Sequence, residues 1–431
     1  MPNTFQEKND DIAQNHYIHT QFMNNSLHRE HVCSVAASLG DMHTSCCISI
    51  CIPAYQEWSV IYNTLEHYTI WQITPDGKPL HPDMFEINIL INRPNPTTPI
   101  DISMLEEIKR FQTLHPEYHI HTAEVVYDFG IKPKIGQIFK DIVDAVILRN
   151  TKRTVSTKAK ERIIIRTAGA DVEALNPLLL SRTISIFEDQ TVIAHRWETH
   201  LPPELLRNFP LLDIIQTASI FLLRQYHGPH IINGPFSYLA EAYAIVWGFD
   251  GEKYVGEEMD LSERIHAHAK DADGERTFRL DRVSDVLNNP RRQVQSLLQW
   301  SGMAGRYQNF WCEDNENAVR NMSQSWRTIS NESLPDYCRL NIENLSREIS
   351  EYYRVYIRIA AGEKMDLSVA RERINPLFLR VLELYGIQSY KFRNEETIAS
   401  HQIEISDMTP MTQKMKDPDF SWRKAFFGES I

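Results

Sequence analysis

Short apolar runs alternate with amphipathic stretches along the first part of the chain. Four runs have the length and composition of buried or half-buried strands: residues 45–52, 85–92, 119–127 and 162–166. Three stretches between them repeat apolar residues at helical spacing: residues 58–68, 101–114 and 138–148. Strands and helices in this alternating order are typical of a parallel sheet with helices on its faces. The pattern therefore predicts an α/β fold with a Rossmann-like, mostly parallel sheet.

The pattern changes near residue 290. Three later stretches have helical spacing with no clear strand between them: residues 294–300, 340–361 and 376–385. Together with the shifts in composition, this predicts four segments. They are a polar, partly disordered leader at 1–45, an α/β domain at 46–290, a helical region at 291–393 and a tail at 394–431.

Composition and charge narrow the classes of function. The chain has 45 Lys and Arg against 57 Asp and Glu, a formal net charge of −12. This balance argues against a protein that mainly grips nucleic-acid phosphates. The sequence contains no signal peptide and no run of 18 or more apolar residues, so we expect no membrane span. Six sparse cysteines without a Cys-x-x-Cys pair favour free thiols in a reducing cytoplasm over a zinc site.

In a parallel sheet, ligands bind beyond the carboxyl ends of the strands. One such end has three small residues, Ala168 to Ala170, followed by Asp171. Small residues allow a ligand to approach the backbone. A carboxylate there can bind a divalent cation, and the cation neutralises a diphosphate. The alternative is an ordinary capping aspartate in a strand-to-helix loop.

A second acidic cluster precedes a predicted helix. Glu257, Glu258 and Asp260 lie close together in the sequence, and one of these carboxylates could take a proton from a hydroxyl group as a general base. The alternative is that acidic residues favour the amino terminus of any helix because of its dipole. His266 and His268 follow, two residues apart, a spacing that points them in different directions on a helix.

The order and spacing of five segments carry a further signal: Ile48–Glu57, Gly136–Arg149, Ala168–Asp171, Asn233–Asp250 and Gly256–Arg264. The first ends in Pro-Ala-Tyr-Gln-Glu, and the last contains Glu-Glu-Met-Asp-Leu followed by Arg. In this order they resemble the inverting, nucleotide-sugar-dependent glycosyltransferases of the GT-A fold, in particular glycosyltransferase family 2. The resemblance covers roughly residues 46–300.

The resemblance implies an enzyme that moves a sugar from a nucleoside-diphosphate donor to a hydroxyl acceptor, with Mn²⁺ or Mg²⁺ as cofactor. The acceptor would be a glycan, a lipid-linked sugar or a small molecule, as in polysaccharide biosynthesis. The catalytic base would be Glu258. The donor would be bound by Pro53, Ala54, Tyr55, Glu57, Asn92, Asp171 and Arg264. The acceptor would be bound by Gly234, Trp247, Glu257 and Asp260. The metal would be bound by Asp171, with His266 and His268 as candidates to complete the site, of which at most one would face it.

The sequence departs from the family pattern at two positions. Gly169 replaces the first Asp of the family's Asp-x-Asp motif, and Glu258 replaces an Asp as the base. Two other functions stay open: a nucleotidyltransferase-like enzyme on a similar sheet, and a non-catalytic binding module in polysaccharide assembly. The absence of a Gly-rich phosphate loop from the sequence disfavours the first of these. Peripheral membrane contact and a homo-oligomer also stay open.

Overall fold

The computed structural model describes residues 4–128, 134–157, 162–200, 206, 209–228, 236–253, 256–271, 277–288, 336, 339–362, 366–394 and 396–428. The chain divides into two compact units. Unit 1 comprises Met1–His200 and His230–Asn288, and unit 2 comprises Leu201–Pro229 and Asn289–Ile431. The chain therefore leaves unit 1, contributes a segment to unit 2, and returns to complete unit 1 before it enters unit 2 again.

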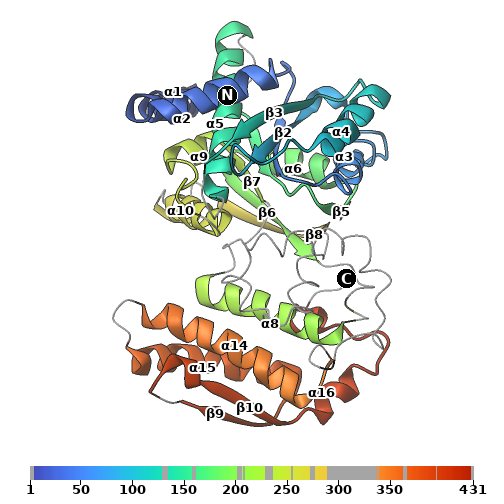
Figure 1. The fold of residues 1–431 in the computed structure, drawn as a ribbon, viewed down its shortest axis with the longest axis vertical. Coiled ribbons are helices and arrows are strands. Elements are labelled where there is room, and N and C mark those ends of the chain that lie inside the picture. Colours follow the sequence, from blue (N-terminus) through green and yellow to red (C-terminus); the bar gives the residue numbers. More distant parts are fainter. Residues whose placement is uncertain are drawn as a thin grey trace. The chain divides into compact units, whose positions relative to one another are not determined.

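Unit 1 is built on an eight-stranded sheet in the order β3-β2-β1-β4-β7-β6-β8-β5 (Figure 1). Its strands are β1 (Ile48–Ala54), β2 (Phe85–Arg93), β3 (Ile120–Val126), β4 (Ile164–Thr167), β5 (Val172–Leu175), β6 (Val192–His200), β7 (Phe236–Leu239) and β8 (Thr277–Asn288). The strands β1 to β4 form parallel pairs, as do β6 and β8. Only β7 and β5 run antiparallel to their neighbours in this sheet. The predicted α/β class with a mostly parallel sheet is confirmed.

The four strands predicted from apolar runs are β1 to β4. Every residue of β2 except the last is buried, as are all but one of β1. This explains why β1 reads as a nearly continuous apolar run, whereas β2 also buries the polar residues Glu86, Asn88 and Asn92. Pro53 lies inside β1 instead of ending it. The pairing of β1 with β4 stops at Cys51 and Thr167, so the N–H that Pro53 lacks has no ladder partner at that point.

Helices flank this sheet (Figure 1). They include α3 (Ile61–Tyr68), α4 (Ile102–Leu114), α5 (Ile135–Thr157), α6 (Leu179–Glu188), α9 (Ala240–Ile245) and α10 (Glu257–Asp271), with a 3-10 turn η1 (Pro82–Met84) before β2. The three helices predicted between the first strands are α3, α4 and α5. The first residue before α4 is its cap, because the Asp101 carboxylate accepts a hydrogen bond of 3.0 Å from Met104 N.

The expectation of a polar, partly disordered leader at residues 1–45 is wrong. Residues 4–39 form two helices, α1 (Thr4–Asn24) and α2 (Ser26–Leu39), and α2 buries His28, Val32, Val35 and Leu39. Both helices pack against α5. The sequence reads as polar because part of what these helices bury is polar or aromatic, and such residues are easily taken for solvent-exposed ones.

A buried polar network holds the two amino-terminal helices to α5. His28 lies between two carboxylates, with Nδ1 3.0 Å from Asp141 Oδ1 and Nε2 2.7 Å from Asp144 Oδ2. The Tyr17 and Tyr243 hydroxyls donate to Asp144 Oδ1 at 2.8 and 3.0 Å. Burial opposes a charge on His28, but hydrogen bonds to both carboxylates outweigh it and raise the His28 pKa to about 9. The network therefore contains a buried imidazolium near neutral pH.

Unit 2 has its own hydrophobic core. Its described elements are α8 (Pro210–His227), α14 (Ile342–Ala361), α15 (Leu367–Tyr385), β9 (Ser389–Arg393), η5 (Ile398–Ser400), β10 (Gln402–Asp407), α16 (Thr409–Lys414) and α17 (Trp422–Phe427). The apolar side of α8 packs against α14, α15 and α17, and the Tyr385 hydroxyl donates to the Ile214 carbonyl. This core buries Trp422 near the end of the chain.

Three expectations about the second half need correction. The segment 201–229 was expected within the α/β domain, but its apolar helix α8 belongs to the core of unit 2. The segment 394–431, expected as a tail, is folded, because Ile403, Met411 and Trp422 are buried there. Strand β9, in the region expected to be helical, pairs with strand β10, in the segment expected as a tail. The predicted helix at 294–300 lies outside the described residues.

No helix in the described part of the chain is long and apolar enough to cross a membrane.

Candidate functional site

The carboxyl ends of β1, β2 and β4 bring three groups of candidate donor residues to one edge of the sheet: Pro53–Glu57, Asn92 and Asp171. The register pairs Ala54 with Ile91 and Cys51 with Thr167. Asn92 bridges the first two segments, because its side-chain amide donates to Ala54 O at 3.1 Å. The candidate donor residues from these two strands therefore lie side by side, as the predicted α/β fold requires.

The loop after β1 has a strained backbone. Gln56 has a φ of 57°, a left-handed conformation that costs a non-glycine residue roughly 1–2 kcal/mol. The next residue, Glu57, is buried, and its carbonyl accepts hydrogen bonds from Val60 N and Ile61 N at 3.0 and 2.9 Å, which starts α3. Strain that the surroundings maintain is concentrated at functional sites in proteins. The segment Pro53–Glu57 therefore has the rigid, shaped backbone that a binding loop needs.

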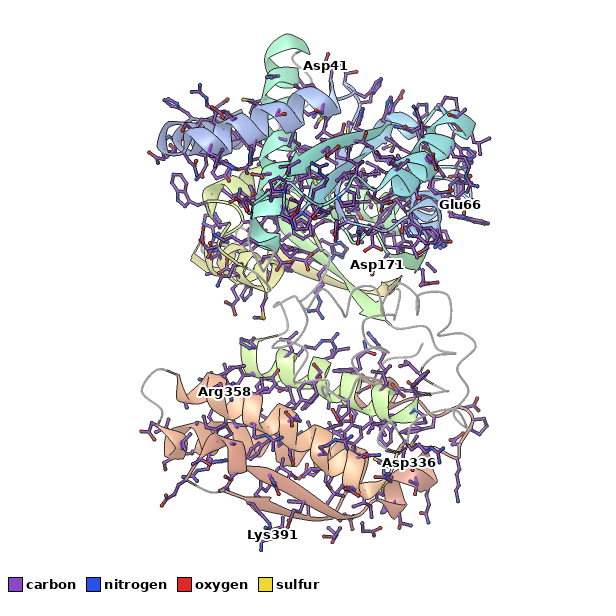
Figure 2. All side chains as sticks on the ribbon, in the orientation of Figure 1. Asp41, Glu66, Asp171, Asp336, Arg358 and Lys391 are labelled. Atoms are coloured by element: carbon purple, nitrogen blue, oxygen red, sulfur yellow. The ribbon has the colours of Figure 1, made fainter. Side chains whose placement is uncertain are left out.

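The loop after β4 is fixed by α3. The Thr64 hydroxyl donates to Ala170 O at 2.8 Å and accepts from Val172 N at 3.0 Å. The neighbouring Asn63 amide donates to Val172 O at 2.9 Å. These bonds lie on both sides of Asp171, which is half-buried between β4 and β5 and is labelled in Figure 2. The loop that carries the candidate metal ligand is thus held at two backbone positions.

Gly169, which replaces the first Asp of the motif, lies directly beside the side chain of Asp171. A Cβ atom built on Gly169 would lie 2.7 Å from Asp171 Oδ1, closer than real contacts allow. The Asp171 carboxylate therefore folds back over Gly169. A larger residue at position 169 would force that carboxylate to move. The glycine and the orientation of the remaining aspartate belong together in this chain.

Glu258 lies beside the end of β4. The Thr167 hydroxyl donates to Glu258 Oε1 at 3.2 Å, which brings the first turn of α10 to the residue that precedes the Ala168–Asp171 loop. Burial and the charge of Glu257 raise the Glu258 pKa to about 8, against the opposing effects of Thr167 and Arg166. A carboxyl group with a pKa near neutral pH is suited to proton transfer, because it can both accept and release a proton.

The turn before α10 is positioned by α5. A Cβ atom on Gly136 would lie 2.1 Å from Asp250 O, so only glycine allows this approach. Gly136 N also donates to Lys253 O at 3.0 Å. The segment at 136–149 therefore contributes to the site by positioning the approach to α10.

Arg264 and Asp260 are engaged with each other. Arg264 Nη2 lies 2.6 Å from Asp260 Oδ2, and Arg264 Nη1 donates to the Val246 carbonyl. Lys253 Nζ lies 3.7 Å from the other oxygen of Asp260. This arrangement ties α10 to the turn at 246–248. The described contacts of Arg264 are thus with protein groups, whereas the resemblance implied that Arg264 binds the donor.

Trp247 is a second strained residue. It has a φ of 66°, which is unusual for a bulky side chain, and its side chain is 48% exposed. Its ring centroid lies 6.0 Å from that of His16 and 6.2 Å from that of Tyr17 on α1. The indole is therefore about half exposed although it contacts α1, and a ligand such as a sugar can reach it. Gly234, the remaining predicted acceptor residue, lies outside the described residues.

The predicted metal ligands are not gathered into one cluster. The donor atoms of Asp171, His266 and His268 do not all lie within 4.8 Å of one another. Among the described residues, the group of donor atoms that meets this distance contains none of these three residues. His266 packs its ring edge-on against Phe278, with centroids 6.2 Å apart. Asp171 alone still fits a Mg²⁺- or Mn²⁺-type ion, since such ions take one or two carboxylates plus substrate phosphates and water.

Several residues that position the site were not singled out by sequence. Thr64 and Thr167 make the hydrogen bonds that bring α3 and α10 to the loop after β4. One signal was available: Thr64 falls among the apolar positions Ile61, Leu65 and Tyr68 on the buried side of a predicted helix. A polar side chain at such a position needs a partner.

No family model matches the chain, and no curated protein matches it. Among solved structures, the chain is similar to glucosyl-3-phosphoglycerate synthase from Mycobacterium tuberculosis in complex with Mn²⁺, UDP and phosphoglyceric acid. The identity is 13%, over 71% of this chain and 84% of that chain, with a TM-score of 0.35. It is also similar to the mannosyltransferase PcManGT from Pyrobaculum calidifontis in complex with GDP-Man and Mn²⁺. That match has 12% identity over 87% of this chain and 100% of that chain, with a TM-score of 0.34.

At TM-scores of 0.35 and 0.34, the similarity assigns no activity to this chain. Its function has to be argued from its own residues.

Proposed function

We propose that this protein is an inverting glycosyltransferase that moves a sugar from a nucleoside-diphosphate donor to a hydroxyl acceptor. The observation that carries the proposal is the position of Glu258. Its carboxyl group, with a pKa raised to about 8, lies 3.2 Å from the hydroxyl of Thr167 at the carboxyl end of β4. A base with this pKa at the ligand-binding edge of an α/β sheet is what deprotonation of an acceptor hydroxyl requires.

In this mechanism the donor occupies the loops after β1, β2 and β4. Pro53, Ala54, Tyr55 and Glu57 would bind its nucleoside, with Asn92 alongside, and Asp171 would face its diphosphate. A divalent cation held there by Asp171 would offset the charge of the leaving nucleoside diphosphate. This role also explains how an acidic site accepts a phosphate-bearing substrate.

Glu258 would take the proton of the acceptor hydroxyl as that oxygen attacks the anomeric carbon. The new bond forms on the face opposite the carbon–oxygen bond to the diphosphate, which breaks, so a single displacement inverts the anomeric configuration. Glu257 and the exposed part of the Trp247 side chain would contact the acceptor. Asp260 would act through its pair with Arg264, which holds the turn that carries Trp247.

Ligand-dependent stabilisation tests the donor site. We expect one of the UDP-, GDP- or dTDP-linked sugars to raise the melting temperature in the presence of Mn²⁺ and to have less effect without it, since a ligand that binds only the native state stabilises it. Asp171→Asn should remove the dependence on Mn²⁺. Asp41→Asn, a change at an exposed residue on a different part of unit 1 (Figure 2), should not. No response to any donor would refute the proposal.

The reaction product separates the proposed activity from the other enzyme class. Release of a free nucleoside diphosphate supports glycosyl transfer, whereas release of pyrophosphate supports nucleotidyl transfer. Donor binding without any turnover, unchanged by Glu258→Gln, would support a binding module.

A further inference from the structure

A second group of ligating side chains lies away from the candidate active site. His43, Asp83 and His119 precede the strands β1, β2 and β3, respectively. Because these strands are parallel, the residues that precede them meet at the amino edge of the sheet, whereas Asp171 follows the carboxyl end of β4. Figure 2 shows Asp41, two residues before the first of these ligands, and Asp171 on different sides of unit 1.

The donor atoms of the three residues converge. One ligand atom from each lies within 4.8 Å of the other two. His119 Nε2 is 2.8 Å from Asp83 Oδ1, and His43 Nε2 is 3.7 Å from Asp83 Oδ2. The two imidazole rings are stacked, with centroids 5.1 Å apart and an angle of 20° between their planes. Two ring nitrogens thus face the two oxygens of one carboxylate.

The sheet holds these positions in place. Cys47 N donates to Met84 O at 2.8 Å, one residue after Asp83, and Ile87 N donates to the carbonyl of His119 at 2.9 Å. Both hydrogen bonds extend the ladders that pair β1 with β2 and β2 with β3. A site whose backbone is part of a sheet is better organised in advance than one built on loops alone.

A third imidazole lies nearby but has another role. His81 Nδ1 also lies 3.7 Å from Asp83 Oδ2, but it accepts a hydrogen bond of 3.3 Å from Asp83 N that caps the turn η1, and its side chain is exposed. The cluster therefore offers three protein ligands. A fourth position, in a tetrahedral arrangement, would be open to water.

The donor set indicates which cation would bind. Hard cations such as Mg²⁺ prefer oxygen ligands, whereas two imidazoles and one carboxylate suit zinc, which is commonly held by three protein ligands and a water molecule. We propose that His43, Asp83 and His119 bind a zinc ion at the amino edge of the sheet. This site is separate from the donor site and does not depend on the proposed glycosyl transfer.

The three ligands should contribute unequally. His43 Nδ1 accepts a hydrogen bond of 3.2 Å from Ser45 N. Binding of a metal at Nε2 would place the ring proton on Nδ1 and break that bond, at a cost of about 1 kcal/mol. His119 Nε2 would give up its 2.8 Å hydrogen bond to Asp83 Oδ1, but that carboxylate would become a ligand of the same metal, so the contact is replaced and not lost. We therefore expect His119 and Asp83 to dominate the affinity.

Zinc titration of the full-length protein tests the site. The wild type, freed of metal, should take one Zn²⁺ per chain from a chromophoric chelator, and its melting temperature should rise with one equivalent of Zn²⁺. Loss of an outer-sphere partner already weakens metal binding by roughly 10–100-fold, so His119→Gln and Asp83→Asn should each weaken it by at least about 100-fold. His115→Gln is the matched control, because His115 lies in the same loop before β3 but packs on Phe111.

Circular dichroism of each variant without zinc checks that it is folded. Where His119→Gln fails to fold, Asp83→Asn and His43→Gln give the same comparison. Absence of stoichiometric binding by the wild type would overturn the proposal. Equal zinc affinity in the wild type and in the folded cluster variants would do so too, since the metal would then be bound at other histidines or cysteines.

Discussion

Glu258 sets the expected pH dependence of activity at the scale of single residues. A general base acts in its ionised form, and burial together with the charge of Glu257 raises the Glu258 pKa to about 8. We expect kcat to rise with pH through about 8, measured as release of nucleoside diphosphate at saturating substrates. Glu258→Gln should lower kcat by about 10²–10⁴-fold. Glu263→Gln, at an exposed position of the same helix, should leave kcat near the wild-type value.

The same variant has a second readout in stability. The Glu258 pKa in the folded state lies above the ordinary value of 4.5, so its contribution to stability is complete below about pH 4.5 and is lost as the pH rises through about 8. Glu258→Gln should therefore raise the melting temperature at about pH 9 and change it little at about pH 4.5. A flat pH profile of kcat together with unchanged stability would show that the carboxyl group is neither buried nor the base.

The motif order singled out Glu258 and Asp171 as candidate site residues, but it did not indicate the residues that hold them in place. Thr64 contacts the loop around Asp171 across more than 100 residues of chain, and the partner of Glu258 is Thr167, 91 residues away. Such contacts depend on the register of the strands, which a single sequence does not specify.

Among the helices, α2 carries the clearest pH-dependent contact. Its residue His28 has a folded-state pKa of about 9 against an ordinary value of 6.5. The stabilisation that protonated His28 provides through Asp141 and Asp144 is complete below about pH 6.5 and is lost as the pH rises through about 9. We expect the melting temperature of the wild type to fall between about pH 7 and pH 10 in part for this reason.

His28→Gln measures that contribution. Removing one partner of a buried ion pair costs about 3–5 kcal/mol, because Asp141 and Asp144 lose their shared cation, so unfolding by denaturant at pH 7 should require less urea. The variant should also lose most of the alkaline fall in melting temperature. His19→Gln on the exposed face of α1 is the control and should behave as the wild type. Equal pH dependence in both variants would rule out His28 as the titrating group.

The elements that the sequence predicted best are those buried on apolar surfaces. Strand β1 is nearly all apolar, β2 alternates apolar residues with Glu86 and Asn88, and the spacing in α3 and α4 is regular, so pattern and structure agree. The helices α1 and α2 were missed because His28 and Tyr17 bury polar groups in a hydrogen-bonded network. Pattern analysis counts such residues as exposed.

For the whole molecule, the division into two units predicts the outcome of truncation. A chain that ends at Asn288 contains all of unit 1 but also α8, whose buried residues, such as Leu211 and Phe221, pack on the missing helices of unit 2. An uncovered apolar face of this kind promotes association. We expect this truncated chain to elute as oligomers or aggregates in size-exclusion chromatography.

The matched variant replaces residues 201–229 of that truncated chain with a Gly/Ser linker of similar length. It lacks α8 and should therefore remain monomeric and unfold cooperatively. If the truncated chain that keeps α8 is equally monomeric, the assignment of α8 to the core of unit 2 is wrong.

The interleaved order of the segments also matters while the protein is being made. About 115 residues separate the end of α8 at His227 from the start of its partner α14 at Ile342. At the usual elongation rates of roughly 5–20 residues per second, α8 is synthesised about 6–23 seconds before that partner exists. During this interval the nascent chain carries an uncovered apolar helix, so we expect the protein to require chaperone binding on the ribosome even though its finished fold buries that helix.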